Sequence, residues 1–153
     1  MKTSEHGLRF IQEQELLRLK AYLCSGGVWT IGYGHTGMVD GVLIGPGMII
    51  TNEKAKELFR NDIMLFERFL NKQTFADRLT QNQYDALISF MFNVGVGHFQ
   101  SSTMFRKLQS GESEESIVKE FGRWIYATIN GKKAVLPGLV SRRDEEANMF
   151  LRK

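Results

Sequence analysis

The hydrophobic and polar positions of the chain change their periodicity twice. Residues 7–20 repeat apolar side chains at helical spacing, which predicts a short helix with Glu15 near its C-terminal end. Residues 26–47 hold eight of the fifteen glycines and the strand-favouring stretch from Val28 to Tyr33, which predicts short strands joined by tight turns. After this glycine-rich stretch the helical spacing returns and continues to the end of the chain. The pattern therefore predicts an α+β fold with a segregated sheet.

The helical remainder divides at recognisable start signals. Thr51 is placed to cap a long helix whose apolar stripe is broken only by Asp62. A capping box at residues 80–83 opens the next apolar run. A serine followed by acidic residues predicts the start of two more helices, over residues 113–124 and 141–151.

These elements predict one domain over residues 1–153. We expect an N-terminal lobe with a glycine-rich antiparallel sheet, a long connecting helix and an all-helical C-terminal lobe, at about residues 1–50, 51–72 and 73–153. A cleft between two such lobes is the place where a ligand is expected.

The composition excludes several kinds of site. Cys24 is the only cysteine, so the chain cannot be a disulfide-built scaffold or hold zinc on a set of cysteines. The three histidines are widely separated and have no second ligand at metal-binding spacing. Phosphate-binding loops and nucleophile elbows are also absent from the sequence. We therefore expect no metal and no cofactor.

Twenty basic and seventeen acidic residues give a net charge of +3. This small excess fits an ordinary solvated surface or weak attraction to a polyanion such as an anionic cell envelope. No basic run exceeds two residues, so nucleic acid is not an expected partner. The N-terminus has no signal-peptide pattern, and no run approaches about 18 apolar residues, so we expect no membrane segment and a cytoplasmic protein.

Three side chains stand out for their types and spacing, which is E-x8-C-x5-T. Glu15 ends the first helix, Cys24 follows in a turn, and Thr30 lies on the first strand. A helix end, a reversal and a strand can bring three such side chains to one mouth of a cleft. The residues alone also allow a solvated glutamate, a buried inert cysteine and a packed threonine.

The segment around these residues resembles the catalytic segment of the phage-type lysozymes, the endolysins of glycoside hydrolase family 24. Residues 18–36 read RLKAYLCSGGVWTIGYGHT, and that family combines E-x8-[D/C]-x5-T with a T-I-G-x-G-H strand. The resemblance continues in the same order along essentially the whole chain, through residues 79–87, 92–95 and 99–103, Trp124, and residues 137–143.

The resemblance implies hydrolysis of the β-1,4 bond between N-acetylmuramic acid and N-acetylglucosamine in peptidoglycan, which lyses the host cell. Glu15 is then the general acid, held protonated by partial burial, and Thr30 orients the attacking water. Cys24 occupies the position usually held by Asp. A thiol with an ordinary pKa of about 8.5 is mostly neutral at pH 7, and a nearby carboxylate favours the neutral form further. Cys24 therefore acts either as a base that places water or as a nucleophile that forms a covalent intermediate.

Other positions take their expected roles from the same resemblance. Thr36, Phe92 and Ser102 match positions that contact substrate. His35 is expected to be structural, hydrogen-bonded at the end of its strand. Arg142 is the nearest match to an arginine that pairs with the catalytic glutamate.

Two alternatives to a hydrolase stay open. A lytic transglycosylase needs only the glutamate, and a wall-binding relative could have lost catalysis with the Asp. For the hydrolase, we expect a monomer that binds peptidoglycan glycan strands. We also expect it to accumulate in the host cytoplasm until a separate holin opens the route to the periplasm and cell wall.

Overall fold

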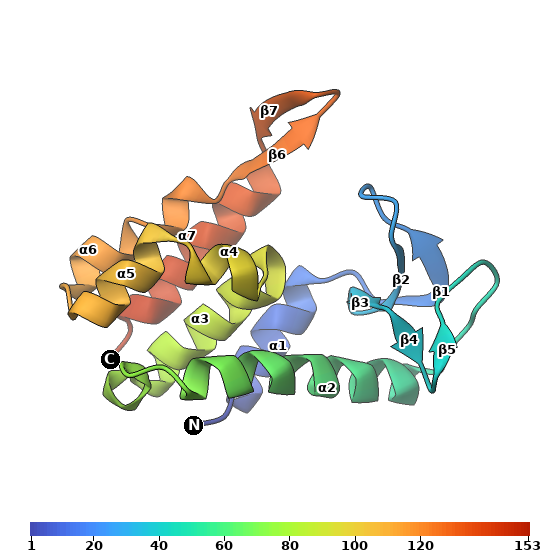
Figure 1. Cartoon of the computed structure of the whole chain (residues 1–153), viewed down its shortest axis with the longest axis horizontal. Coiled ribbons are helices and arrows are strands. Elements are labelled where there is room, and N and C mark those ends of the chain that lie inside the picture. Colours follow the sequence, from blue (N-terminus) through green and yellow to red (C-terminus); the bar gives the residue numbers. More distant parts are fainter. The chain divides into compact units, whose positions relative to one another are not determined.

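The computed structural model describes all 153 residues and divides them into two compact units (Figure 1). The smaller unit comprises residues 9–65, and the larger comprises residues 1–8 and 66–153. Both boundaries fall inside helices, α1 (Glu5–Gln14) and α2 (Asn52–Asn71). The expected cleft between lobes of a single domain stays a prediction.

The smaller unit contains two antiparallel sheets. The first has strand order β1 (Arg18–Leu23), β2 (Trp29–Gly32) and β3 (His35–Thr36). The second pairs β4 (Met38–Val39) with β5 (Val42–Leu43). The predicted segregated sheet is therefore confirmed.

Strand β1 corrects the prediction that the first helix continues to residue 20. The helix ends at Gln14, and R-L-K-A-Y-L alternates polar and apolar side chains with the period of two that a half-buried strand requires. Ala21 on this strand belongs to the core of the unit. Arg18 and Leu19 therefore pack as strand residues rather than on a helical face.

In the smaller unit, strands, loops and α2 contribute side chains to one compact apolar core. Its buried members are Ala21, Ile31, Val39, Ile44, Ile50, Ala55 and Leu58. The predicted cap of α2 is confirmed, since the Lys54 N–H donates to Thr51 Oγ1 at 3.0 Å. The strands that carry Cys24 and Thr30 at their ends are thus fixed to a capped helix within their own unit.

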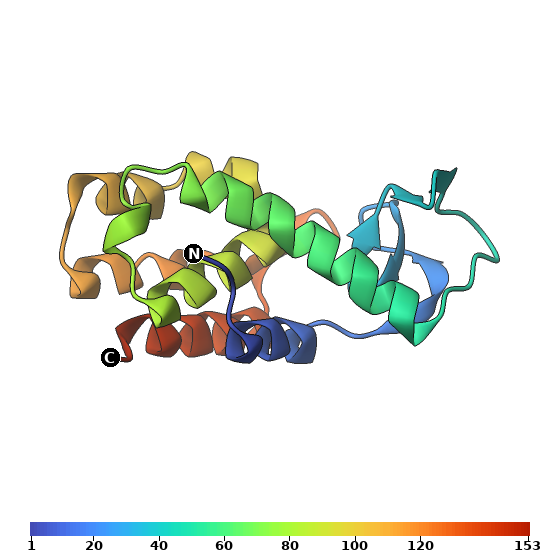
Figure 2. The same ribbon diagram turned by 90° about the horizontal axis from the view of Figure 1, so that it is seen from below.

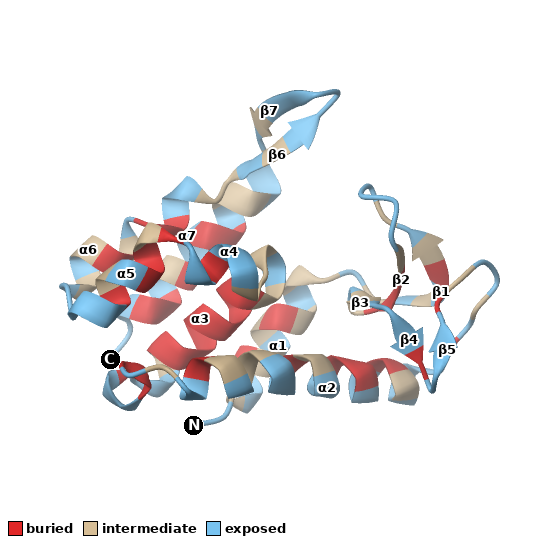
Figure 3. Ribbon diagram, viewed as in Figure 1, coloured by how far each residue is buried: buried red, intermediate tan, exposed pale blue.

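The larger unit is built around α3 (Gln81–Val94), which is the most deeply buried helix in Figure 3. It packs against α7 (Pro137–Leu151), and the two lie side by side in Figures 1 and 2. The predicted capping box is present, with Thr80 and Gln83 each bonding the other's backbone N–H. The remaining helices are α4 (Val96–Gln100), α5 (Thr103–Ser110) and α6 (Glu114–Val118).

The larger unit is not all-helical, which corrects the prediction for the C-terminal part. Strands β6 (Tyr126–Ile129) and β7 (Lys132–Val135) form an antiparallel hairpin. Its turn residues Asn130 and Gly131 have φ values of 51° and 76°, the left-handed pair that a tight two-residue hairpin requires. The Asn-Gly pair between two short strand-like runs was the sequence signal for this hairpin.

The last two helices also differ from their predicted bounds. Helix α6 stops at Val118 and is followed by a separate 3₁₀ turn at Phe121–Arg123, so no continuous helix spans residues 113–124. Helix α7 begins at Pro137 rather than at Ser141, because proline is well suited to the first turn, where its missing N–H is not needed.

Candidate active site

The candidate site is centred on the hairpin that joins β1 to β2. The Cys24 N–H donates to the Val28 carbonyl at 3.0 Å, and the Gly27 N–H donates to the Cys24 carbonyl at 2.9 Å. Gly27 has φ of 76°, a conformation that side chains rarely adopt. Cys24 therefore follows a strand rather than the first helix, and Thr30 lies on the second strand rather than the first. Both corrections follow from strand β1.

The hairpin changes the acid–base behaviour of Cys24. Hydrogen bonding from the Val28 and Gly26 backbones lowers the pKa of the thiol. Burial opposes this effect, and the Thr30 hydroxyl and the Cys24 backbone make smaller contributions that also lower the pKa. Gly26 lies beside the sulfur, since a Cβ at this position would be in ordinary van der Waals contact with Sγ at 3.8 Å. We expected a thiol held in its neutral form, and the hydrogen bonds of the hairpin act in the opposite direction.

Thr30 is buried beside Cys24 at the start of β2. Its Oγ1 donates to the Val28 carbonyl at 3.0 Å and also lies within hydrogen-bonding reach of the sulfur. A hydroxyl has one proton and two lone pairs, so Thr30 donates to only one of these acceptors at a time. When it donates to Val28, its lone pairs can accept from another group.

Glu15 lies directly after α1 and stays attached to its last turn. Its N–H is 3.2 Å from the Ile11 carbonyl and 3.3 Å from the Gln12 carbonyl, as expected for a residue at a helix end. Its Oε2 lies 3.6 Å from where a Cβ on Gly34 would stand. The carboxylate therefore lies against the β2–β3 turn, in the same unit as Cys24 and Thr30.

His35 has the structural role predicted for it. Its Nδ1 lies 2.8 Å from Asp62 Oδ2, and its Nε2 lies 2.8 Å from the Met38 carbonyl. Because a carbonyl only accepts, Nε2 carries a proton, and the contact with Asp62 ties β3 to α2. Burial raises the pKa of the Asp62 carboxyl, and His35 opposes that rise. This pairing explains the one polar break in the apolar stripe of α2.

The three residues expected to contact substrate lie in different surroundings. Thr36 is exposed on β3, opposite Thr30 in the strand register. Phe92 is half-buried in the larger unit, with its ring centroid 5.7 Å from that of Phe66. Ser102, also in the larger unit, is buried and caps α5. Its Oγ accepts from the Phe105 N–H at 3.1 Å and donates to the Phe99 carbonyl at 2.6 Å. The hydroxyl proton of Ser102 is therefore engaged in a hydrogen bond within the protein.

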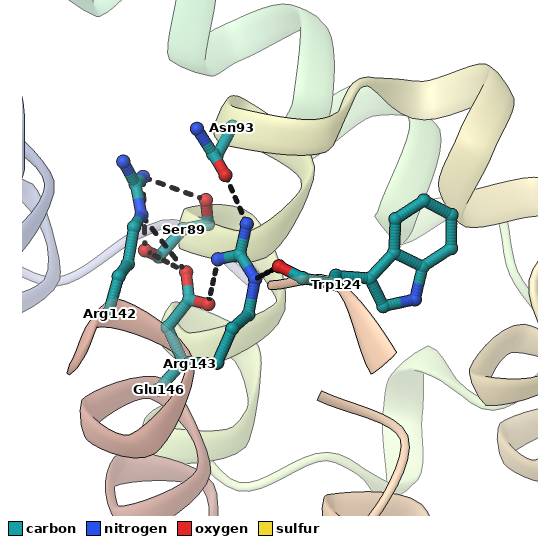
Figure 4. Close-up of polar contacts among 6 residues, drawn as sticks. All are labelled: Ser89, Asn93, Trp124, Arg142, Arg143 and Glu146. Carbon is teal, nitrogen blue, oxygen red and sulfur yellow. Dashed lines mark hydrogen bonds and ion pairs between the residues drawn. The ribbon is translucent and has the colours of Figure 1, made fainter. Parts of the chain in front are cut away.

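Arg142 belongs to a buried polar network in the larger unit (Figure 4). Its Nη2 donates to the Ser89 carbonyl at 3.1 Å, and its Nε lies 3.4 Å from Glu146 Oε2. Ser89 Oγ donates to the same carboxylate oxygen at 2.6 Å. Arg143 pairs with the other oxygen of Glu146, and its Nε donates to the Trp124 carbonyl at 3.0 Å.

One carboxylate therefore compensates two guanidinium groups. Burial raises the pKa of the Glu146 carboxyl, and the two arginines oppose this effect. Arg142 was predicted as a functional residue from the sequence, whereas Glu146 was not. The signal was the spacing R-R-x-x-E, which places the carboxylate three and four residues from the arginines on one helix face.

The comparisons with known proteins agree with this fold and motif. The family model described as phage lysozyme matches residues 12–146. The chain is 44% identical to an endolysin from Acyrthosiphon pisum secondary endosymbiont phage 1, over 98% of each protein. It is 39% identical to the endolysin of Salmonella phage P22, over 99% of each.

Solved structures give the same result. The muramidase domain of SpmX from Asticaccaulis excentricus superimposes with a TM-score of 0.85 and 34% identity, over 99% of both chains. A point mutant of P22 lysozyme gives a TM-score of 0.79 and 36% identity, again over 99% of both chains.

The fold and motif define a lysozyme-like α+β glycoside hydrolase. The family match extends over most of the sequence, and the chain belongs to the phage lysozyme family. It is a lysozyme of the endolysin type, which acts on peptidoglycan and serves host lysis. None of its helices is long and apolar enough to cross a membrane.

Proposed function

We propose that this enzyme hydrolyses the β-1,4 bond between N-acetylmuramic acid and N-acetylglucosamine with Glu15, Cys24 and Thr30. The observation that carries the proposal is the set of hydrogen-bond donors around the Cys24 sulfur. An inert structural cysteine is buried among apolar groups, whereas this sulfur is accessible and its pKa is lowered. The position that usually holds Asp thus carries a side chain that can be an anion.

Glu15 is proposed as the general acid. The bond breaks between the anomeric carbon and the bridging oxygen, and the proton of the Glu15 carboxyl goes to that oxygen. The carboxyl group is half-buried beside Gly34, where no side chain separates it from the turn. Any side chain at position 34 would occupy space next to this carboxylate.

Cys24 is proposed as the base for water, with Thr30 as its partner. A water molecule can donate one hydrogen to the Cys24 thiolate and the other to Thr30 Oγ1 while Thr30 donates to Val28. Both hydrogens of the water are then engaged, and a lone pair on the water oxygen points away from the hairpin. As that oxygen bonds to the anomeric carbon, its proton passes to the sulfur. The reaction leaves a Cys24 thiol and a Glu15 carboxylate, and solvent exchange restores the starting protonation.

The glycan contacts are proposed from the family resemblance. Thr36, Phe92 and Ser102 are the positions concerned. Phe92 offers a half-buried ring for an apolar sugar face. Ser102 is proposed to contribute through its backbone and its remaining lone pair, because its proton bonds the Phe99 carbonyl.

Digestion of purified peptidoglycan with mass analysis of the fragments tests the proposal. Wild type is expected to release fragments with reducing N-acetylmuramic acid ends. Glu15→Gln and Cys24→Ser are each expected to lower the rate by at least about a hundredfold, since each removes a proton-transfer group. Ser25→Ala, next to Cys24 in the same turn, is the matched control and is expected to keep wild-type activity.

Three outcomes would contradict this assignment. Anhydromuramic products would identify a lytic transglycosylase. Binding to the wall without release of any fragment would identify a wall-binding relative. Unchanged activity of Cys24→Ser would remove Cys24 from the mechanism while leaving Glu15 in it.

The route to the wall is part of the same proposal. We infer that the enzyme acts as a monomer and reaches peptidoglycan after a separate holin permeabilises the membrane. Expression with and without a membrane-permeabilising agent tests this. Lysis only with the agent is expected, and equal lysis without it would contradict the need for a holin.

A further inference from the structure

The three-stranded sheet of the smaller unit has an apolar face and a polar face. Ala21 of β1 and Ile31 of β2 belong to the apolar core. On the other face the strand register forms a row of three side chains, with Tyr22 opposite Thr30 and Thr30 opposite Thr36. Directly opposite residues of an antiparallel pair have their side chains on the same face. Tyr22 and Thr36 are therefore the two cross-strand neighbours of Thr30.

Thr30 is covered although it lies on the polar face. It is 4% exposed, whereas its neighbour Thr36 is exposed and has a small side chain. The neighbour on the other side, Tyr22, is half-buried and has the larger side chain of the two. Opposite side chains have Cβ atoms about 5 Å apart, which is within the reach of an aromatic ring. The register thus identifies the Tyr22 ring as the cross-strand cover of Thr30.

The Tyr22 ring is itself held by a second side chain of β1. The guanidinium carbon of Arg18 lies over this ring, 4.8 Å from its centroid. A guanidinium at this distance is attracted by the electrons of the ring face. Because Arg18 is exposed, the ring has a cation on its outer side and does not lie open to water on that side.

The rotamer of Thr30 decides which groups its hydroxyl reaches. In this structure Oγ1 donates to the Val28 carbonyl at 3.0 Å and lies within hydrogen-bonding reach of the Cys24 sulfur. Rotation about the Cα–Cβ bond to another staggered rotamer moves the hydroxyl away from both groups. A ring packed over Thr30 opposes this rotation, because the methyl group then has no free space to enter.

We propose that Tyr22 is a positioning residue for the reaction, whose ring keeps Thr30 in the rotamer that reaches Val28 and Cys24. Arg18 supports this role by holding the ring in place. The inference rests on the proposed function, because it takes Thr30 as the residue that orients the attacking water. Tyr22 acts through Thr30 and touches no reacting atom, so the role needs its ring and not its hydroxyl.

Steady-state kinetics on soluble peptidoglycan fragments test this role. Tyr22→Ala is expected to lower kcat about tenfold and to leave KM unchanged, because Thr30 then populates rotamers that do not orient water. Tyr22→Phe keeps the ring and is expected to equal wild type. Leu23→Ala is the matched control, since Leu23 is exposed and pairs with Trp29 at the next position of the register. It is also expected to equal wild type.

A double-mutant cycle separates positioning from a general effect on the sheet. In a Thr30→Val background, Tyr22→Ala is expected to cause no further loss, because no hydroxyl is left to orient. The same tenfold loss in both backgrounds would overturn the proposal. A rise in KM with kcat unchanged would also overturn it, because Tyr22 would then be a glycan contact.

The Thr30 rotamer can be measured directly, which separates this inference from the proposed function. Three-bond couplings from the Thr30 methyl carbon to the backbone nitrogen and carbonyl carbon report its rotamer populations in ¹³C,¹⁵N-labelled protein without substrate. Wild type and Tyr22→Phe are expected to show one rotamer, and Tyr22→Ala averaged couplings. A failure of Cys24 or Glu15 in catalysis would leave this result unchanged.

Arg18→Ala tests the same inference without removing a packed ring, because Arg18 is exposed. It is expected to give partial averaging of the Thr30 couplings and a two- to fivefold lower kcat, which is the size of an exposed cation–π contact. One unaveraged Thr30 rotamer in both Tyr22→Ala and Arg18→Ala would overturn the inference even if the enzyme cleaves by the proposed mechanism.

Discussion

At the scale of single residues, the thiol of Cys24 is the group whose chemistry depends most on the fold. The backbones of Val28, Gly26 and Cys24 itself and the Thr30 hydroxyl lower its pKa, and all of them belong to the β1–β2 hairpin. The motif spacing in the sequence identified the residue, but it could not show these donors, because backbone N–H groups leave no signature in the side-chain pattern. The direction of the pKa shift at Cys24 could therefore not be predicted from the sequence.

The lowered pKa of Cys24 predicts alkylation by iodoacetamide at lower pH than for an ordinary cysteine. Hydrogen bonds to the thiolate favour the charged form, so the midpoint of the rate–pH profile is expected at lower pH in the folded protein than in the unfolded chain. Thr30→Val removes one donor and is expected to move the midpoint upward. The urea-unfolded protein is the control, and identical midpoints in the folded and unfolded forms would contradict the account.

Gly7 illustrates a second constraint at the residue scale. A Cβ at this position of α1 would lie 2.6 Å from Asp85 Cγ. Asp85 cannot simply move, because it accepts hydrogen bonds from the Ser4 N–H at 3.0 Å and from Gln81 Nε2 at 2.8 Å. Gly7 therefore allows the N-terminal segment to pack closely on α3.

Gly7→Ala is expected to lower the free energy of unfolding by about 1–3 kcal/mol, as overpacking does, although alanine is normally the better helix former. Gly138→Ala in α7 is the matched control, since a Cβ there meets nothing within 4 Å. Urea denaturation measures both. A stabilised Gly7→Ala variant would show that Asp85 has room to shift.

At the scale of elements, the sequence correctly predicted features that depend only on side chains close together in the chain, such as helix caps. The caps at Thr51 and Thr80 were predictable because each hydroxyl accepts from an N–H only three residues further along the chain. The hairpin at β6–β7 was missed because a helical expectation was applied to the whole C-terminal part, although Asn130-Gly131 indicated a turn. The end of the first helix was misplaced because Leu19 fits both a helical face and a strand face.

The capping box gives a prediction at this scale. Thr80→Ala is expected to lower the free energy of unfolding by about 1 kcal/mol, because the Gln83 N–H at the start of a buried helix loses its acceptor. Thr80→Ser keeps the acceptor and is expected to stay within a few tenths of wild type. Equal losses in both variants, measured by urea denaturation, would assign the effect to the methyl group instead of the cap.

At the scale of the whole molecule, the buried network on α7 links distant parts of the larger unit. Glu146 joins Arg142 and Arg143 to Ser89 of α3, and Arg143 reaches the Trp124 carbonyl ahead of the hairpin. Such a network depends on residues more than fifty positions apart in the chain, which is why single-sequence patterns identified only its adjacent arginines.

Glu146→Gln is expected to cost about 3–5 kcal/mol of unfolding free energy, because it leaves two buried guanidinium groups without their carboxylate. Asp144→Asn removes an exposed charge from the same helix and is expected to stay within about 0.5 kcal/mol of wild type. Denaturant unfolding of both variants at pH 7 is the measurement. A loss below about 1 kcal/mol for Glu146→Gln would mean that water replaces the carboxylate.

The proposed mechanism, in which the Cys24 thiolate takes a proton from a water held by Thr30, is tested most directly by the anomeric configuration of the first-formed product. Rapid proton NMR of a soluble peptidoglycan fragment during wild-type digestion gives this configuration before mutarotation. Direct attack of water on a β-linked bond inverts the anomeric centre, so the proposed mechanism requires that the new reducing end appears first as the α-anomer. First appearance of the β-anomer would contradict it and would instead identify Cys24 as a covalent nucleophile.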